Sequence, residues 1–319
     1  MSNLEIIPLT ESLREEWDGV VTASDDAWLF HQYDWVTEVN ERVWGYHSES
    51  FLLRDGGRII GICPLFLREQ QLGPGVRWRF LSTGGFGIAG PAFIPALNAA
   101  QRQEYIAATF AEIDRFAREL GVDRLDVRIP PLAPASLAAQ PEYVMALSAF
   151  GFRDCSTQTY LVHLDGRSVE DLWRQLAQRC RWSIRKAERN GVTVREMDPI
   201  QSVDQYYDLH RTTYRRTGAQ PHPRAYFEAI SRFGWTKRFA AVHYDRVIAA
   251  MNVTTYKRGA LYLTSASDAT ALALGANNLL QWHAIQWAKT NGFAWYEVGE
   301  AFPNSEHAKQ AGLTTYKAS

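Results

Sequence analysis

The chain has 319 residues, 46% of them hydrophobic and 13% aromatic, so it holds enough apolar material for two domains of ordinary size. Its formal net charge is −1, which excludes the global positive field typical of proteins that bind DNA or a membrane surface. Residues 1–5 lack a basic and apolar leader pattern, and the most apolar window, residues 59–67, is too short for a transmembrane segment. We therefore expect a folded, cytoplasmic protein that acts on a small or modular substrate.

The first half of the chain alternates strand-like and helical patterns of hydrophobic residues. Helices are expected at residues 13–21, 33–43 and 101–120, and the last of them ends at Gly121. Strands are expected at residues 4–8, 77–81 and 124–129, with a hairpin over residues 51–67 that turns at Asp55-Gly56-Gly57. This order predicts a mixed α/β domain.

The second half repeats the same order of elements after a turn at residues 165–167. Helices are expected at residues 170–190, 203–216, 223–233 and 278–290. Strands are expected at residues 193–197, 260–266 and 294–298, with a hairpin over residues 238–255 that turns at residues 244–246. The predicted fold class is therefore α/β of the mixed α+β type, with two similar domains at residues 1–164 and 165–319.

A short loop opens the helix at residues 278–290 and follows a predicted strand. Its residues are Gly275, Ala276, Asn277 and Asn278. The start of a helix presents unpaired backbone N–H groups and the positive end of the helix dipole, both of which attract anions. This loop is our candidate for binding the anionic part of a cosubstrate.

The helix expected at residues 170–190 carries a second candidate anion site. Arg181, Arg185 and Arg189 share one of its faces, opposite an apolar stripe. Guanidinium groups pair well with phosphate, which suggests a diphosphate-linked precursor, CoA or RNA as the ligand. The alternative is a solvated helix face with cations near the negative end of the dipole.

Other motifs favour no further chemistry. The sequence Gly85-x-Gly87-x-x-Gly90 matches the dinucleotide-binding pattern, but Pro91 follows it and no helix opens there, so we interpret it as a flexible loop lining a cleft. No HExxH, GxSxG or P-loop motif occurs, and the three cysteines lack metal-ligand spacing. Neither a hydrolase site nor a bound metal is predicted.

Four segments carry a resemblance to a known family: residues 30–35 (FHQYDW), 181–192 (RWSIRKAERNGV), 278–289 (NLLQWHAIQWAK) and 312–317 (GLTTYK). In this order they resemble the tandem-GNAT group, which contains the Fem peptidyltransferases of peptidoglycan bridge synthesis and the FemAB-like or BioF2-like acetyltransferases found with exopolysaccharide systems. The resemblance implies two tandem GNAT-like domains, each a mixed, mostly antiparallel sheet flanked by helices. It places the donor site in the C-terminal domain, where the usual pyrophosphate loop is reduced to Gly275-Ala276.

The resemblance also implies roles for residues near the end of the chain. Lys317 matches the family lysine that meets developing negative charge, and Glu297 and Glu300 are candidates for the base that deprotonates an amine. Strand alternation places Glu297 opposite its neighbours, so the alternative is a surface charge. Four residues are expected to line the acceptor site, and two histidines are weaker candidates: Tyr214, Arg216, Tyr262 and Tyr316, with His210 and His283.

The implied function is N-acyl transfer by direct attack of an amine on the donor. Acyl-CoA, such as acetyl-CoA, is the implied cosubstrate, and the acceptor is an amine of a cell-envelope or exopolysaccharide precursor, whether a small molecule, a glycan or a peptide. Two alternatives remain. An aminoacyl-tRNA donor, as in Fem-type peptidyltransferases, would explain the reduced pyrophosphate loop, and a noncatalytic scaffold that binds a glycan or a protein would leave the acid–base residues without a function.

Overall fold

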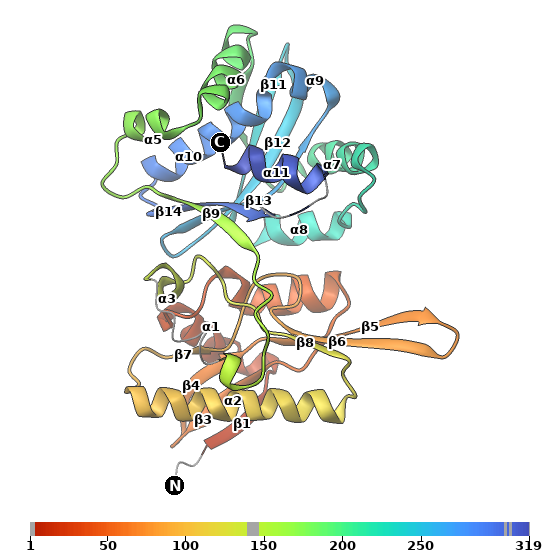
Figure 1. Cartoon of the computed structure of the whole chain (residues 1–319), viewed down its shortest axis with the longest axis vertical. Helices are drawn as coiled ribbons and strands as arrows, with labels where there is room; N and C mark the ends of the chain where they lie inside the picture. The colour runs from red at the N-terminus through yellow and green to blue at the C-terminus, as the bar shows by residue number, and fades with distance from the viewer. Residues whose placement is uncertain (1–3, 139–146, 303–304, 306–307, 319) are drawn as a thin grey trace. The chain divides into compact units, whose positions relative to one another are not determined.

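The chain divides into two compact units, Met1–Asp154 and Cys155–Ser319 (Figure 1). A computed structural model describes residues 4–138, 147–302, 305 and 308–318. The first unit has two sheets and the second has one, each with flanking helices, and each unit is described by itself.

The first unit contains two four-stranded sheets, with strand orders β1-β3-β4-β7 and β2-β5-β6-β8. Their strands are β1 (Leu4–Pro8), β2 (His47–Ser48), β3 (Phe51–Asp55), β4 (Arg58–Cys63), β5 (Leu65–Gly73), β6 (Val76–Thr83), β7 (Ala92–Phe93) and β8 (Arg124–Asp126). The single hairpin predicted over residues 51–67 is wrong in its second arm. Pro64 has no N–H to donate, so β4 ends before it, and the chain continues as β5 in the other sheet.

Helices cover these sheets and the aromatic core beneath them. They are η1 (Glu11–Leu13), α1 (Arg14–Ala23), η2 (Leu29–His31), the π-helix η3 (Trp35–Val43), α2 (Ala99–Glu119) and α3 (Pro134–Leu137). Asn98 caps α2 in a reciprocal capping box with Gln101. The helix packs on β3, because the ring of Phe116 lies 6.1 Å from that of Phe51.

The glycine-rich loop at residues 84–90 is tied to its own unit. The Phe86 N–H donates to Asn40 Oδ1 (2.6 Å), and the Arg128 guanidinium donates to the carbonyl oxygens of Gly85 and Gly87. A Cβ at Gly90 would stand 2.7 Å from the carbonyl oxygen of Arg128. The glycines therefore serve close backbone packing within the first unit.

The second unit is built on one six-stranded sheet of order β10-β11-β12-β13-β14-β9. Its strands are β9 (Gln158–His163), β10 (Thr193–Met197), β11 (Thr236–His243), β12 (Arg246–Tyr256), β13 (Gly259–Ser267) and β14 (Trp295–Ala301). All neighbours are antiparallel except β13 and β14. The edge strand β9, which the sequence analysis assigned to the first domain, pairs with β14 in this sheet.

Seven helices are described in the second unit: α5 (Val169–Gln175), α6 (Gln178–Arg189), α7 (Val203–Thr217), α8 (Arg224–Arg232), α9 (Ala269–Leu274), α10 (Ala276–Thr290) and α11 (Ala308–Lys317). The helix predicted over residues 170–190 is wrong in one respect, because it is two helices with extended backbone at Leu176 and Ala177. The sequence pattern also missed α9 and α11. Helix α9 has only six residues between its N-cap Asp268 and its C-cap Gly275, and α11 contains Gly312, so neither has the long uninterrupted hydrophobic period by which a helix is predicted.

The two faces of this sheet carry different side chains. Phe239 on β11 faces α10, with its ring 5.5 Å from that of Trp287. The next residue back, Arg238, faces α7 and lies 4.8 Å from the Tyr206 ring centroid. The α6 and α10 face therefore holds the apolar core, whereas the α7 face is partly polar.

No helix among the described residues is long and apolar enough to cross a membrane.

Candidate active site

Strands β13 and β14 separate partway along their length. They pair only where Gly259–Leu261 meets Trp295–Glu297, although both strands continue beyond that point. Each strand carries an extra residue in its pairing with the neighbour on its other side, between Tyr262 and Thr264 in β13 and between Glu297 and Glu300 in β14. Such bulges bend a strand and end its pairing, so they open a gap in the middle of the sheet.

Lys317, at the end of α11, lies at this gap. Its Nζ donates to the carbonyl oxygen of Glu300 (2.6 Å) and lies 5.9 Å from the Tyr262 ring centroid. Gly299 has a φ of +79°, and a Cβ there would stand 3.1 Å from Nζ. Burial lowers the pKa of the Lys317 ammonium, and the nearby Glu300 and Glu297 oppose that shift. The structure therefore positions a partly desolvated cation between the two strands.

Glu297 is a buried carboxyl group, with only 4% of the residue exposed. Its Oε1 accepts a hydrogen bond from the Thr159 hydroxyl of β9 (2.9 Å). Burial raises its pKa to about 7, although this hydrogen bond and the charge of Lys317 act in the opposite direction. The interpretation of Glu297 as a surface charge is therefore wrong, while Glu300 is exposed.

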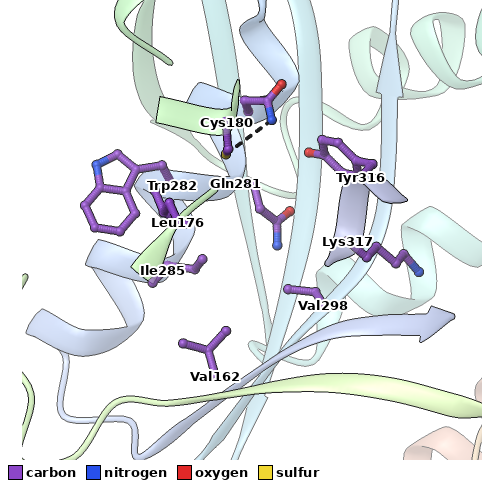
Figure 2. Close-up of a pocket in the computed structure, with 10 residues that line it drawn as sticks. Val162, Leu176, Cys180, Gln281, Trp282, Ile285, Val298, Tyr316 and Lys317 are labelled. Carbon is purple, nitrogen blue, oxygen red and sulfur yellow. Dashed lines mark hydrogen bonds between the residues drawn. The ribbon is translucent and has the colours of Figure 1, made fainter. Parts of the chain in front are cut away.

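A cavity of about 510 Å³, which we call the inner cavity, has Lys317 among its lining residues (Figure 2). Its volume includes the part open to solvent. Its walls come from β9, the α5–α6 connection, α6, α10, β14 and α11: Val162, Leu176, Cys180, Asn278, Gln281, Trp282, Ile285, Val298, Tyr316 and Lys317. Most of this lining is aliphatic or aromatic.

A second, more open cavity adjoins the first and shares Cys180, Asn278 and Tyr316 with it. We call it the outer cavity, and its remaining lining residues are Arg179, Ser183, Gly312 and Thr315. The Arg179 guanidinium donates to the carbonyl oxygen of Thr315, and the Tyr316 hydroxyl donates to that of Asn277 (3.0 Å). The two cavities together lead from an exposed arginine to a partly buried lysine.

The predicted donor loop lies beside these cavities, but α6 covers its first residue. Gly275 has a φ of +78°, and a Cβ there would stand 2.6 Å from the carbonyl oxygen of Ser183. Ala276 is fully buried, and Asn277 accepts from Tyr316. Of the four loop residues, Asn278 alone is among those that line the cavities.

We expect Gly275→Ala to destabilise the protein by more than about 1 kcal/mol, because alanine is strained at positive φ and its methyl group would push α6 away from α10. Urea unfolding of both proteins measures this difference. Gly292→Ala is the matched control, since Gly292 also has positive φ but nothing within 4 Å of its Cβ position. Equal losses for the two variants would contradict close packing at Gly275.

The predicted arginines of α6 do not converge on the cavities. Arg181 donates to the carbonyl oxygens of Arg174 and Leu176 (2.8 Å each) and so caps α5. The Arg185 guanidinium lies 5.5 Å from a ring centroid of Trp173, and Arg189 is exposed. Arg179 does line a cavity. The sequence analysis missed it because the helical period shows which residues share a face of the helix, but not which other elements that face contacts.

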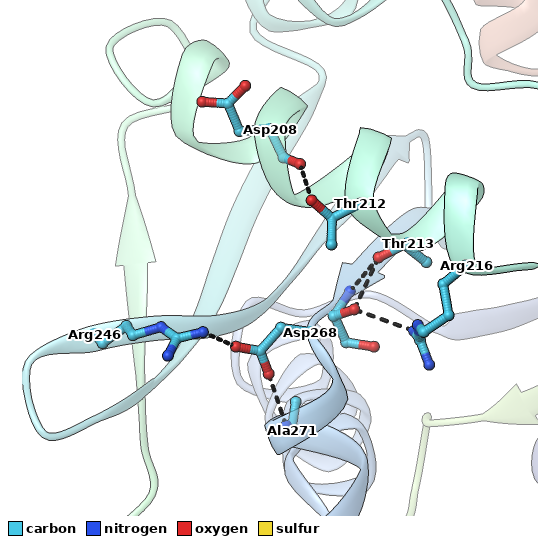
Figure 3. Close-up of polar contacts among 8 residues, drawn as sticks. Asp208, Thr212, Thr213, Arg216, Arg246, Asp268 and Ala271 are labelled. Carbon is cyan, nitrogen blue, oxygen red and sulfur yellow. Dashed lines mark hydrogen bonds and ion pairs between the residues drawn. The ribbon is translucent and has the colours of Figure 1, made fainter.

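Helix α7 packs beside the separated part of β13. The Thr213 hydroxyl and the Arg216 guanidinium both donate to the carbonyl oxygen of Ser267 (Figure 3). Tyr214 is half-buried and lies close enough to Tyr262 to raise its pKa, although burial contributes more. The structure thus brings Tyr214 and Tyr262 together and uses Arg216 to hold α7 against β13.

The two candidate histidines have surroundings typical of packing. His210 is fully buried and accepts from the backbone N–H of His222 (3.2 Å), and burial lowers its pKa to about 3. His283 lies with its ring edge toward Phe239 at 5.1 Å. Neither is among the residues that line the cavities. In the described residues, no group of three or more His, Cys, Asp or Glu side chains forms a metal site.

Comparisons with known proteins bear on the domain family and the fold. Residues 174–317 match the family model described as an acetyltransferase (GNAT) domain. No curated protein matches the chain in sequence.

Solved structures match the chain over nearly its whole length. FemX has 14% identity and a TM-score of 0.70, over 98% of this chain and 93% of that one. A tandem GNAT protein from the clavulanic acid biosynthesis pathway has 15% identity and a TM-score of 0.56, over 98% of this chain and 94% of that one. The C-terminal domain of a putative lysylphosphatidylglycerol synthetase from Agrobacterium fabrum has 14% identity and a TM-score of 0.60, over 96% and 87%. Residues 174–317, most of the second unit, therefore match a GNAT acetyltransferase domain, which supports an acyltransferase, and the chain as a whole has the FemAB-like tandem GNAT fold that the sequence predicted.

Proposed function

We propose that the chain transfers an acyl group from acyl-CoA to an amine of a cell-envelope or exopolysaccharide precursor, by direct transfer. The observation that carries this proposal is the position of Lys317, which lines the inner cavity and whose ammonium lies at the strand gap, within the electrostatic influence of the buried Glu297. A cation at a cavity and a nearby carboxyl group of raised pKa suit amide formation from a thioester.

The cavities fit the chemistry of an acyl-CoA donor. Gln281 lines the inner cavity, and its side-chain oxygen Oε1 is buried and has no hydrogen-bond partner among the described residues (Figure 2). In our proposal it accepts an amide N–H of the pantetheine arm, which would satisfy an otherwise costly buried acceptor. Arg179 and Ser183 in the outer cavity hold the phosphate end, in place of the covered Gly275 and Ala276.

Two side chains carry the chemistry in this proposal. The carboxylate of Glu297 takes a proton from the acceptor amine as its nitrogen bonds to the thioester carbonyl carbon. The ammonium of Lys317 stabilises the resulting oxyanion. The carbon–sulfur bond then breaks, and the proton passes to the leaving thiolate, so that amine and thioester become amide and thiol.

The acceptor site is proposed on the α7 side of the gap. Tyr214 and Tyr262 lie near each other there, and the Tyr262 hydroxyl is hydrogen-bonded to Ser265. Tyr316 instead bonds Asn277 and lines both cavities, so we place it on the donor side. Aromatic faces with hydroxyl groups at their edges suit a glycan or a peptide acceptor.

We expect CoA and acetyl-CoA to raise the apparent melting temperature in a saturable way, because a ligand that binds only the folded state stabilises it. Arg179→Ala should weaken CoA binding about tenfold or more, through loss of a charge-assisted phosphate contact. Arg195→Ala is the control, since Arg195 is an exposed arginine of β10 and is not among the residues lining the cavities. A saturable shift that both variants retain equally would remove Arg179 from the donor site.

An aminoacyl-tRNA donor is the second candidate, and one observation favours it. The start of α10, where a CoA pyrophosphate is expected, is covered by Ser183. A folded sample that shows no shift with CoA, but that forms amide product with charged tRNA, would support this alternative. A sample that binds a glycan or a protein and forms no product with either donor would support the noncatalytic scaffold.

A further inference from the structure

We infer that the inner cavity selects an aliphatic acyl chain longer than acetyl, an inference that rests on the proposed function. The wall away from Lys317 is apolar: Val162 comes from β9, Leu176 from the α5–α6 connection, Trp282 and Ile285 from α10, and Val298 from β14. These five side chains come from four separate parts of the second unit. Their convergence leaves an apolar surface that only a nonpolar ligand group covers favourably.

The polar lining residues come from α11 and the first two turns of α10. Lys317 ends α11, and Asn278 and Gln281 belong to α10, where the thioester and its amide-bearing arm would lie. Gln281 lies between Ile285 and Lys317 in Figure 2. An acetyl group beside Lys317 would leave the apolar wall uncovered. A longer chain would extend along it between α10 and β14, and each buried methylene would raise the affinity about fourfold.

Two residues would set the length of the chain. Ile285 projects from α10, and Val162 faces it from β9 at the lower end of the cavity in Figure 2. Both residues lie away from Lys317 in that view, and Gln281 lies between Ile285 and Lys317. A larger side chain at either position would therefore shorten the space for the acyl chain without touching the residues proposed for catalysis.

The test compares acetyl-, butanoyl-, hexanoyl- and octanoyl-CoA as donors to one amine acceptor, for the wild-type chain and for Ile285→Phe. We expect wild-type kcat/KM to rise with chain length, and Ile285→Phe to lower the ratio of kcat/KM for octanoyl-CoA to that for acetyl-CoA at least about tenfold. Val162→Phe, on a different element, should have the same effect if Ile285→Phe fails to fold. Leu272→Phe is the control, because Leu272 on α9 is 52% exposed.

The outcomes separate this inference from the proposed function. A wild-type chain that prefers acetyl-CoA, or variants that lower all four donors equally, would overturn chain selection while leaving acyl transfer intact. Transfer from none of the four donors by a folded sample would overturn both. A rise with chain length that disappears in Ile285→Phe and Val162→Phe, but not in Leu272→Phe, would establish the apolar wall as the acyl-chain site.

Discussion

Substituting Lys317 by methionine is expected to lower kcat about 100- to 1,000-fold, the usual loss when a single oxyanion-stabilising group is removed. The side chain is partly buried at the gap between β13 and β14, so water cannot readily take over the stabilising role of its charge. Methionine has nearly the same length and no charge, so the cavity keeps its shape. Steady-state kinetics with saturating donor and acceptor measure the effect.

The control for this prediction is Lys289→Met, which removes a lysine from the last turn of α10 that is not among the cavity-lining residues. Its kcat should stay within about twofold of the wild-type value, as expected for a half-buried position away from the cavities. A fall of less than about tenfold in Lys317→Met, with the fold intact by circular dichroism, would mean that the ammonium does not stabilise the oxyanion.

The second prediction concerns Glu297 and pH. Because burial raises the pKa of this carboxyl group to about 7, kcat/KM should rise with pH and level off above that value. Glu297→Gln should lower the plateau about 100- to 10,000-fold and remove this acid limb. Glu300→Gln discriminates between the two carboxyl groups, since Glu300 is exposed and its loss should leave the acid limb in place.

A positioning variant tests the same assignment. The Thr159 hydroxyl bonds Glu297 Oε1 and lowers its pKa, so Thr159→Val should move the acid limb to higher pH without abolishing turnover. An unchanged pH profile in Thr159→Val and in Glu297→Gln would assign the proton transfer to another group.

The raised pKa of Glu297 also predicts how the stability of the protein depends on pH. The pKa of Glu297 is raised on folding from an ordinary value of 4.5 to about 7, so the folded chain binds one more proton between these values. The free energy of unfolding should therefore fall as pH rises through this window, by up to about 1.4 kcal/mol per pH unit. Urea unfolding at several pH values should show this loss in the wild-type chain relative to Glu297→Gln.

Local patterns in the sequence predicted most helices and strands, because hydrophobic period and turn residues act within a few positions. The hairpin at Tyr244 and Asp245 is one case, since both residues adopt the positive φ that such a two-residue turn needs. The break between α5 and α6 is the opposite case. The break contains no Gly or Pro. The carbonyl groups at the end of α5 instead accept hydrogen bonds from Arg181 of α6, and such a contact between two helices is not visible in a local sequence pattern.

The sequence indicated some residues of the candidate site, but not the residues that surround them. A family signature indicated Lys317, and the last predicted strand indicated Glu297. What surrounds them depends on pairing between segments more than 130 positions apart, such as Thr159 with Glu297. Arg179 and Gln281 were missed for the same reason, because a single helix pattern does not show which residue a neighbouring helix leaves facing a cavity.

Strand β9 bears on how the second unit can be produced by itself. The family match begins at residue 174, yet β9 ends at His163 and pairs with β14 along the outer side of the sheet. A recombinant fragment cut at the start of the match would turn β14 into an exposed edge, with a row of N–H and C=O groups free to pair with another chain. It would also remove Thr159 and expose the carboxyl group of Glu297 to water. We expect such a fragment both to aggregate and to have a changed pKa at Glu297. A fragment that starts at Cys155 keeps β9 and would avoid both effects.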